Sequence, residues 1–161
     1  MSSRLGAMAG FAAILAVPCS AGAQVLMQKD VSLHMALAIA EAASAECGVN
    51  TSVAVVDRAG RLKVFLQGDG AAPHNIELAR RKAYTARTFR RTSADWAKRS
   101  ETTTSAGQRL LNDVVPLQGG VPINVGNDTI GGVGLSGAPN GGEQEEGCAK
   151  AGIAKVADQL K

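Results

Sequence analysis

The first strongly periodic stretch of the chain covers residues 31 to about 46, and Asp30 stands before it as a candidate helix cap. At about 100° per residue, one face of this predicted helix is apolar and much of the remaining surface is apolar too. The core face carries Leu33, Ala36, Leu37, Ala40, Ala43 and Cys47, and the rest carries Met35, Ala38, Ile39, Ala42 and Ala45. A helix that is apolar on nearly every side is buried on more than one side, so we expect a second subunit to cover it.

Two β-rich runs follow at 51–57 and 62–67, and the turn between them contains Gly60, which supplies the positive φ of a short turn. They predict an antiparallel hairpin. After a loop at 68–73, a second helix is predicted over about Asn75–Phe89, with a face of small residues that can lie close to a sheet.

The segment 92–112 is polar and helical in patches, with Ser93 as a candidate cap. Three short strands are then predicted at 114–117, 121–125 and 129–135. Their connections are too short for crossovers, so they form an antiparallel meander.

A last helix is predicted near the C-terminal end of the chain. It opens with Glu143, Glu145 and Glu146 and carries Lys150 and Lys155 further along, as the helix dipole favours, so these acids need no catalytic explanation. The whole order predicts an α+β fold, an antiparallel sheet of about five strands flanked by helices.

Residues 132–137 match G-x-G-x-x-G, the pattern of a dinucleotide-binding turn. That unit needs a second parallel strand after the helix, with an acid about twenty residues on, and only four residues follow Ala157. We therefore expect these glycines to mark close approach to a strand, by a packed helix or by a flat ligand.

The N-terminus has the composition of a secretory signal. Arg4 precedes an apolar run at 5–17, and Ala21-Gly-Ala23 offers a cleavage site before Gln24. The run is too short to span a bilayer. We therefore predict a signal peptide at residues 1–23 and a mature single domain at 24–161, periplasmic or secreted, with no membrane attachment after cleavage.

The charge of the chain is nearly balanced. It has 17 basic and 14 acidic residues, and only Arg4 is lost with the predicted signal, so little net charge remains to attract nucleic acid. The mature aromatics, Phe65, Tyr84, Phe89 and Trp96, form no base-stacking platform. We expect no nucleic-acid partner.

Two cysteines, Cys47 and Cys148, remain in the mature chain, and an oxidising compartment permits a disulfide between them. If the last strand pairs antiparallel with the first, both cysteines lie near one end of the sheet. A bridge there would close a loop of about a hundred residues and add roughly 4 to 5 kcal/mol in the chain-entropy model. Two buried free thiols are the alternative.

Four segments together resemble the GlcG/HbpS family, which is similar to the C-terminal domain of PduO-type proteins. They are VAVVDRAGRL at 53–62, PHNIELARRKAYTARTF at 73–89, GGVPI at 119–123 and GGVGLSGA at 131–138. The resemblance implies a profilin-like sheet, assembly into homo-oligomers with octamers among them, and haem binding. Some members of the family have been called haem-degrading.

Haem would need an axial ligand, an apolar slot and cations for its propionates. The chain has two histidines, and His74 has the better setting because Arg80, Tyr84 and Arg87 follow on the same predicted helix, where guanidinium groups can hold carboxylates. His34, on the first helix, is the second candidate if that helix is an interface. Each histidine is equally well explained as an exposed or hydrogen-bonded imidazole.

The sequence lacks the motifs of a covalent hydrolase and of a cysteine redox site. No G-x-S-x-G elbow or C-x-x-C pair is present, so we assign no catalytic residue. Three interpretations remain. The first is an exported haem-binding protein for sensing, storage or scavenging. The second is a haem-free module that binds a small carboxylate through a stripe of Arg80, Arg87 and Arg91, which is otherwise a solvated face. The third is a haem-degrading enzyme.

Overall fold

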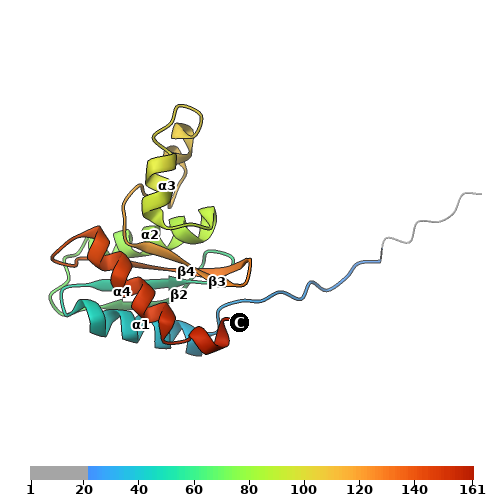
Figure 1. Cartoon of the computed structure of the whole chain (residues 1–161), viewed down its shortest axis with the longest axis horizontal. Helices are drawn as coiled ribbons and strands as arrows, with labels where there is room; N and C mark the ends of the chain where they lie inside the picture. Colours follow the sequence, from blue (N-terminus) through green and yellow to red (C-terminus); the bar gives the residue numbers. More distant parts are fainter. Residues whose placement is uncertain (1–21) are drawn as a thin grey trace, which may run out of the picture.

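The computed structural model describes residues 22–161, so nearly all of the predicted signal peptide lies outside the described residues. A central sheet is covered by α2 on one face and by α1 and α4 on the other, while α3 projects from this body (Figure 1). The helices are α1 (Leu33–Cys47), α2 (Asn75–Phe89), α3 (Ser93–Arg99) and α4 (Gly142–Ala154), with 3-10 turns η1 (Ala106–Leu110) and η2 (Ala157–Gln159). None of the helices in the described part of the chain is long and apolar enough to cross a membrane.

The sheet is antiparallel throughout, with the order β2-β1-β4-β3. Its strands are β1 (Ser52–Val56), β2 (Leu62–Gln67), β3 (Gly120–Val125) and β4 (Asp128–Ser136). The β1–β2 hairpin is confirmed, with Gly60 at a φ of 77° in its turn. The predicted pairing of the first strand with the last is also confirmed, since Ser52 lies opposite Ser136.

The predicted α+β class is confirmed, but the sheet has four strands where we expected about five. The segment 114–117 is extended and pairs with no strand in the described structure. It lies against α2 instead: the Val115 amide donates to the Thr85 hydroxyl at 2.9 Å, and the Val114 carbonyl accepts from the Arg81 guanidinium. Side chains of α2 thus satisfy backbone groups that a neighbouring strand would have satisfied.

The N-caps of α1 and α3 lie one or two residues from the predicted positions. Helix α1 begins at Leu33, and the hydroxyl of Ser32 accepts from the Met35 amide at 3.1 Å. Asp30 instead accepts from the Arg58 amide at 2.8 Å, which ties the start of the domain to the hairpin turn. Thr92 caps α3 in place of Ser93.

The two faces of the sheet carry two separate cores. Val53 and Val55 point to the larger core under α1 and α4, whereas Ala54 and Val56 point to the smaller one under α2. The small-residue face predicted for α2 makes this second core thin. A Cβ added to Gly132 or Gly134 would collide with backbone atoms of α2, so the glycine pattern marks a closely packed helix.

Helix α1 is turned slightly from its predicted orientation. Ile39 is fully buried, while Leu33 is 57% exposed and Leu37 is only half-buried. The first helix therefore leaves part of its apolar surface uncovered within one chain. Its C-terminal end is fastened to α4 by a disulfide between Cys47 and Cys148, whose Cα atoms are 5.8 Å apart.

Candidate functional site

An open cleft of about 440 Å³ lies at the end of the sheet where α2 begins. Its walls come from the first two turns of α2, the segment just before β3, and the loop that leads from β4 into α4. The lining residues are His74, Asn75, Leu78, Lys82, Leu117, Gln118, Ser136, Gly137, Ala138, Gly141, Gly142 and Glu145.

His74 lies in this cleft, at the N-cap position of α2, and its side chain makes no capping hydrogen bond. The side chain is exposed, and no hydrogen bond to another described residue occupies the imidazole. Leu78, one helical turn further on, and Leu117, which is 46% exposed, add apolar surface beside it. The cleft therefore combines one available nitrogen ligand with an apolar wall.

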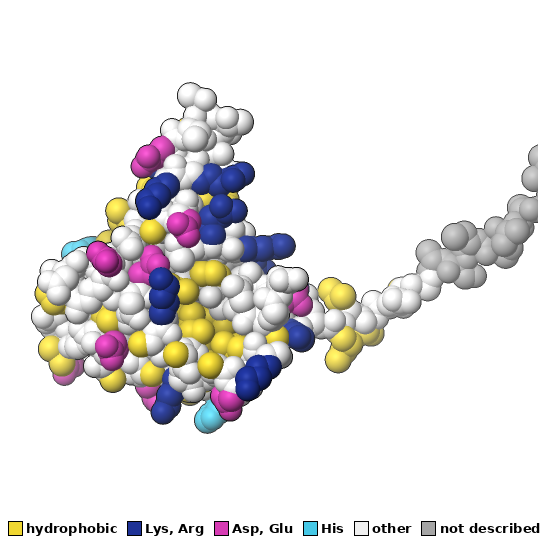
Figure 2. Space-filling model, in the orientation of Figure 1, with side chains coloured by type: hydrophobic (Ala, Val, Ile, Leu, Met, Phe, Trp, Pro, Cys, Tyr) yellow, Lys and Arg dark blue, Asp and Glu magenta, His cyan; other side chains and the backbone are white. Residues whose placement is uncertain are grey.

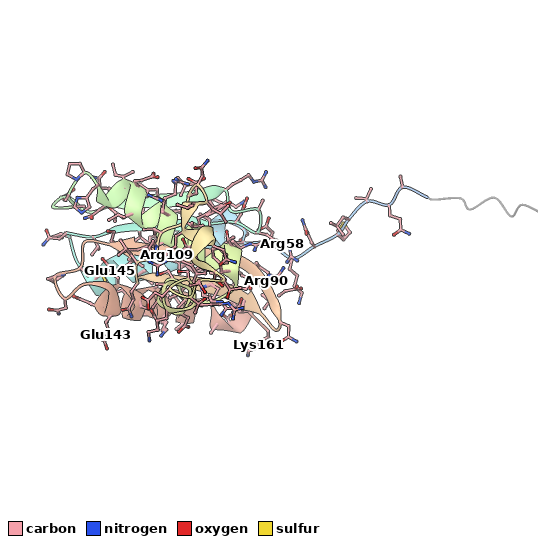
Figure 3. All side chains as sticks on the ribbon, turned by 90° about the horizontal axis from the view of Figure 1, so that it is seen from above. Arg58, Arg90, Arg109, Glu143, Glu145 and Lys161 are labelled. Atoms are coloured by element: carbon pink, nitrogen blue, oxygen red, sulfur yellow. A yellow bond between two sulfur atoms is a disulfide. The ribbon has the colours of Figure 1, made fainter. Side chains whose placement is uncertain are left out.

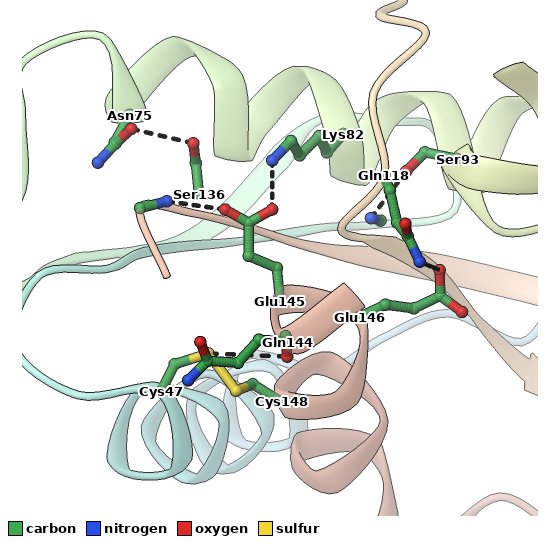
Figure 4. A network of polar contacts seen from close by, with 12 residues as sticks. Cys47, Asn75, Lys82, Ser93, Gln118, Ser136, Gln144, Glu145, Glu146 and Cys148 are labelled. Atoms are coloured by element: carbon green, nitrogen blue, oxygen red, sulfur yellow. Dashed lines mark hydrogen bonds and ion pairs between the residues drawn. A yellow bond between two sulfur atoms is a disulfide. The ribbon is translucent and has the colours of Figure 1, made fainter. Parts of the chain in front are cut away.

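The floor of the cleft is a buried ion pair. The Lys82 ammonium lies 2.5 Å from Oε2 of Glu145, and each side chain is only 5% exposed. The other carboxylate oxygen of Glu145 accepts from the Gly137 amide at 2.8 Å. As Figure 4 shows, the pair joins α2, α4 and the loop after β4, so it fixes three walls of the cleft at one point.

The sequence reasoning missed this pair. The helix dipole explains the exposed Glu143, but Glu145 is buried and needs the charge of Lys82. Helical spacing could have indicated that Glu145 is buried. It stands four residues before Ala149 and seven before Gly152, so it continues the buried face of α4. Lys82 likewise lies on the buried face of α2, beside Ala79.

A second polar contact lies beside the ion pair. The Ser136 hydroxyl donates to Oδ1 of Asn75 at 3.0 Å, which connects the end of β4 to the first residue of α2. The hydroxyl of Ser52, opposite Ser136 across the strands, is buried and finds no partner among the described residues. Helix α2 is therefore held at its start by a side chain rather than by a conventional cap.

The structure does not bring Arg80, Tyr84 and Arg87 to the cleft with His74. Hydrogen bonds from Arg80 to Glu77 and then to Asp113 raise the pKa of its guanidinium and occupy it. Tyr84 and Arg87 line a different hollow, further along α2.

The predicted arginine stripe is therefore not one surface. Helix α2 ends at Phe89, and Arg90 has a left-handed backbone with a φ of 54°. Arg91 thus lies beyond the helix, out of the spacing that placed it in line with Arg80 and Arg87.

His34, the second predicted ligand, is exposed on α1. Helices α1 and α2 cover opposite faces of the sheet, and His34 is not among the residues that line the cleft with His74. Figure 2 shows two separate histidine surfaces, one at the left edge and one at the lower edge of the molecule.

Comparison with known proteins identifies the family and the fold of the chain. A family model described as "Haem degrading protein HbpS-like" matches residues 27–154. This chain belongs to the HbpS-like family. The predicted resemblance to the GlcG/HbpS family is thereby confirmed.

Solved structures support this membership. A double mutant of HbpS from Streptomyces reticuli is 34% identical and superposes with a TM-score of 0.77, covering 86% of this chain and 96% of its own. A structure titled a PduOC:Heme complex is 26% identical with a TM-score of 0.69, covering 78% and 94% of the two chains. The Klebsiella pneumoniae protein ORFY, at 22% identity and a TM-score of 0.75 over 86% and 98%, shares the fold. A comparison with curated proteins found no match.

The residues of the cleft fit a haem group better than a bare metal ion. In residues 22–161, no three His, Cys, Asp or Glu side chains gather as a metal site. A single imidazole beside apolar side chains instead supplies the axial ligand and the apolar wall that haem requires, since the porphyrin supplies the other iron ligands. The volume of about 440 Å³ falls within the range of about 300–1,000 Å³ typical of ligand pockets.

Proposed function

We propose that this protein binds haem in the cleft at the start of α2, with His74 as the axial ligand. The observation that carries the proposal is the exposed imidazole of His74, which has no cap hydrogen bond and lines the same cleft as Leu78 and Leu117. Membership of the HbpS-like family and the haem complex of the PduOC relative support the choice of ligand. When bound, haem supplies an iron centre able to take a further ligand or exchange electrons.

The chain's own groups have distinct roles in this proposal. The first turn of α2 positions the imidazole, while Gly137 and Ala138 form a wall with little side-chain bulk that a flat molecule can approach. Lys82 and Glu145 neutralise one another, and no arginine lines the cleft. We therefore expect the haem propionates at the open side of the cleft, where water solvates their charge.

We further propose that the protein is exported and oligomeric. The signal-like composition of residues 1–23 supports a periplasmic or secreted location. The exposure of Leu33 on α1 supports assembly of several copies, because an uncovered apolar helix face is stabilised by a partner. Haem sensing, storage and scavenging all fit an exported haem-binding protein.

The test is a haemin titration of residues 24–161, monitored by the Soret band, with His74→Ala and His34→Ala in parallel. The two variants are matched, because each removes one exposed imidazole. We expect saturable binding in the wild type and in His34→Ala, and a shifted or lost band in His74→Ala. Loss in His34→Ala alone would move the site to α1, and no saturable band in the wild type would remove haem as the ligand.

The family description favours haem degradation as a second candidate function. It predicts that the bound haem bleaches in the presence of a reductant and oxygen and releases iron faster than free haem does. Equal rates for bound and free haem would leave binding as the function.

A further inference from the structure

A second hollow, of about 220 Å³, lies between the β1–β2 turn and the last turns of α2. Its lining consists of Arg58, Ala59, Gly60, Tyr84, Arg87 and Thr88. The ring of Tyr84 packs directly on the turn: a Cβ added to Gly60 would come within 2.8 Å of its Cε2 atom. The positive φ of Gly60 and this close contact both require glycine, so the turn and the ring form a fixed wall.

Two arginines, Arg58 and Arg87, line this hollow, and the guanidinium of Arg58 also lies 3.6 Å from the carboxylate of Asp128. The Nε of Arg87 donates to the Arg58 carbonyl at 2.5 Å, which anchors its guanidinium to the hairpin turn. Burial, and then the charges of Arg58 and Arg90, lower the pKa of Arg87. Figure 3 shows Arg58 and Arg90 at one end of the molecule and Glu143 and Glu145 at the other.

The charges of Asp30 and Asp57 oppose the lowering of the pKa of Arg87 but act on it without contact. Among the described residues, no acidic side chain lies within ion-pair distance of it. Asp57 accepts from the Ala59 and Arg61 amides and from the Arg61 side chain, and Asp30 accepts from the Arg58 amide. These acids are engaged in holding the turn, so the charge of Arg87 faces the hollow without a counter-charge in contact.

We infer that this hollow binds a small oxyanion, a phosphate or a short carboxylic acid. Guanidinium groups match the geometry of both, and Tyr84 and Thr88, two residues that carry hydroxyl donors, line the same space. A volume of about 220 Å³ is below the range of about 300–1,000 Å³ typical of pockets for larger ligands, which favours a ligand of a few atoms.

This site is separate from the cleft proposed for haem. Arg87 lies thirteen positions after His74, the N-cap residue of α2, which at about 1.5 Å per residue is roughly 20 Å along the helix. Binding of a small anion therefore requires neither His74 nor haem.

The experiment is a calorimetric titration of haem-free protein with inorganic phosphate and, separately, with succinate, at constant ionic strength maintained with chloride. We expect saturable binding of at least one probe, weakened at least tenfold in Arg87→Gln. The matched control is Arg99→Gln, which removes an exposed arginine from α3 and should bind like the wild type. No saturable heat with either probe, or equal weakening in both variants, would overturn the site.

Two further variants keep the test decisive if Arg87→Gln fails to fold. Tyr84→Phe keeps the ring against Gly60 and removes only the hydroxyl, so affinity should fall a few-fold; Arg58→Gln should also weaken binding. Unchanged affinity in both would overturn the inference. The haemin titration of Arg87→Gln should match the wild type, and a loss there would mean that haem itself occupies this hollow.

Discussion

The cleft and the hollow lie at opposite ends of α2 and handle charge in opposite ways. In the cleft, the ammonium of Lys82 is buried against Glu145, so these two charges cancel and the available group is the imidazole of His74. In the hollow, Arg87 is anchored through the Arg58 carbonyl and contacts no carboxylate. The pairing of charges, more than their number, therefore distinguishes the two ends of this helix.

Removing the disulfide should cause the largest loss of stability. The bridge holds α4, which forms part of the wall of the cleft and does not line the hollow. Cys47→Ser or Cys148→Ser should each lower the free energy of unfolding by roughly 4 to 5 kcal/mol, since either change opens the same long loop. Urea denaturation measures this. Haemin binding should weaken in both variants while anion binding at Arg87 persists. Two reactive thiols in the denatured, unreduced wild type would contradict the bridge.

Breaking the ion pair tests the neutral floor of the cleft. Glu145→Gln leaves Lys82 buried without a counter-charge and should cost about 3 to 5 kcal/mol of unfolding free energy. The exposed Glu143→Gln, two residues away on the same helix, is the control and should change little.

A double variant tests whether the unpaired charge of Lys82, or the altered packing around residue 145, causes the loss of stability. Adding Lys82→Met to Glu145→Gln removes the unpaired ammonium and should recover most of the lost stability. If the double variant is as unstable as Glu145→Gln alone, the charge of Lys82 is not the cause.

Gly134→Ala, under the middle of α2, should destabilise the packing of this helix on β4. An alanine at Gly134 places its Cβ against the backbone of Ala79 and Ala83, and such overpacking costs about 1 to 3 kcal/mol. Gly107→Ala, where no atom lies within 4 Å of the added Cβ, is the control. Thermal unfolding compares them, and equal Tm values would mean that α2 can move away from β4 without cost.

The smallest expected effect is a change in the pH dependence of stability when Asp57, in the turn beneath the hollow, is replaced. Burial raises the pKa of Asp57, but hydrogen bonds from Arg61 and Ala59 outweigh it, and the net pKa lies below the usual 3.8. Asp57 therefore stabilises the fold above that value, and this contribution is lost as the pH falls through the lower folded pKa. Asp57→Asn should flatten the pH dependence of Tm below about pH 4. Asp69→Asn, in an exposed loop, should keep the wild-type slope.

Local elements were predictable from the sequence because their signals are local. The pattern between Pro73 and Arg90 gave helix α2 its observed bounds, and Gly60 marked the hairpin turn. The segment 114–117 was wrongly predicted as a strand. Its β-rich composition is compatible with any extended backbone, and only contacts with Thr85 and Arg81 decide what it pairs with.

The candidate site was predictable only in part. His74 was identified because histidines are few and this one precedes a helix, and the structure places it in the cleft. Arg80, Tyr84 and Arg87 were grouped with it by helical spacing, which describes one helix and ignores what packs on each part of it. Arg80 is held by Asp113, and Arg87 is held by the hairpin turn.

By itself, the sequence determined the α+β class, the family, the hairpin and the helix that carries both sites, because periodicity and short motifs act over a few neighbouring residues. Only the tertiary structure decided which charges meet. Lys82 and Glu145 are 63 positions apart, and a carboxylate becomes the partner of a buried ammonium only when packed helices bring the two within hydrogen-bond distance. The same packing left Arg87 without such a partner among residues 22–161, and that difference separates the two ends of α2.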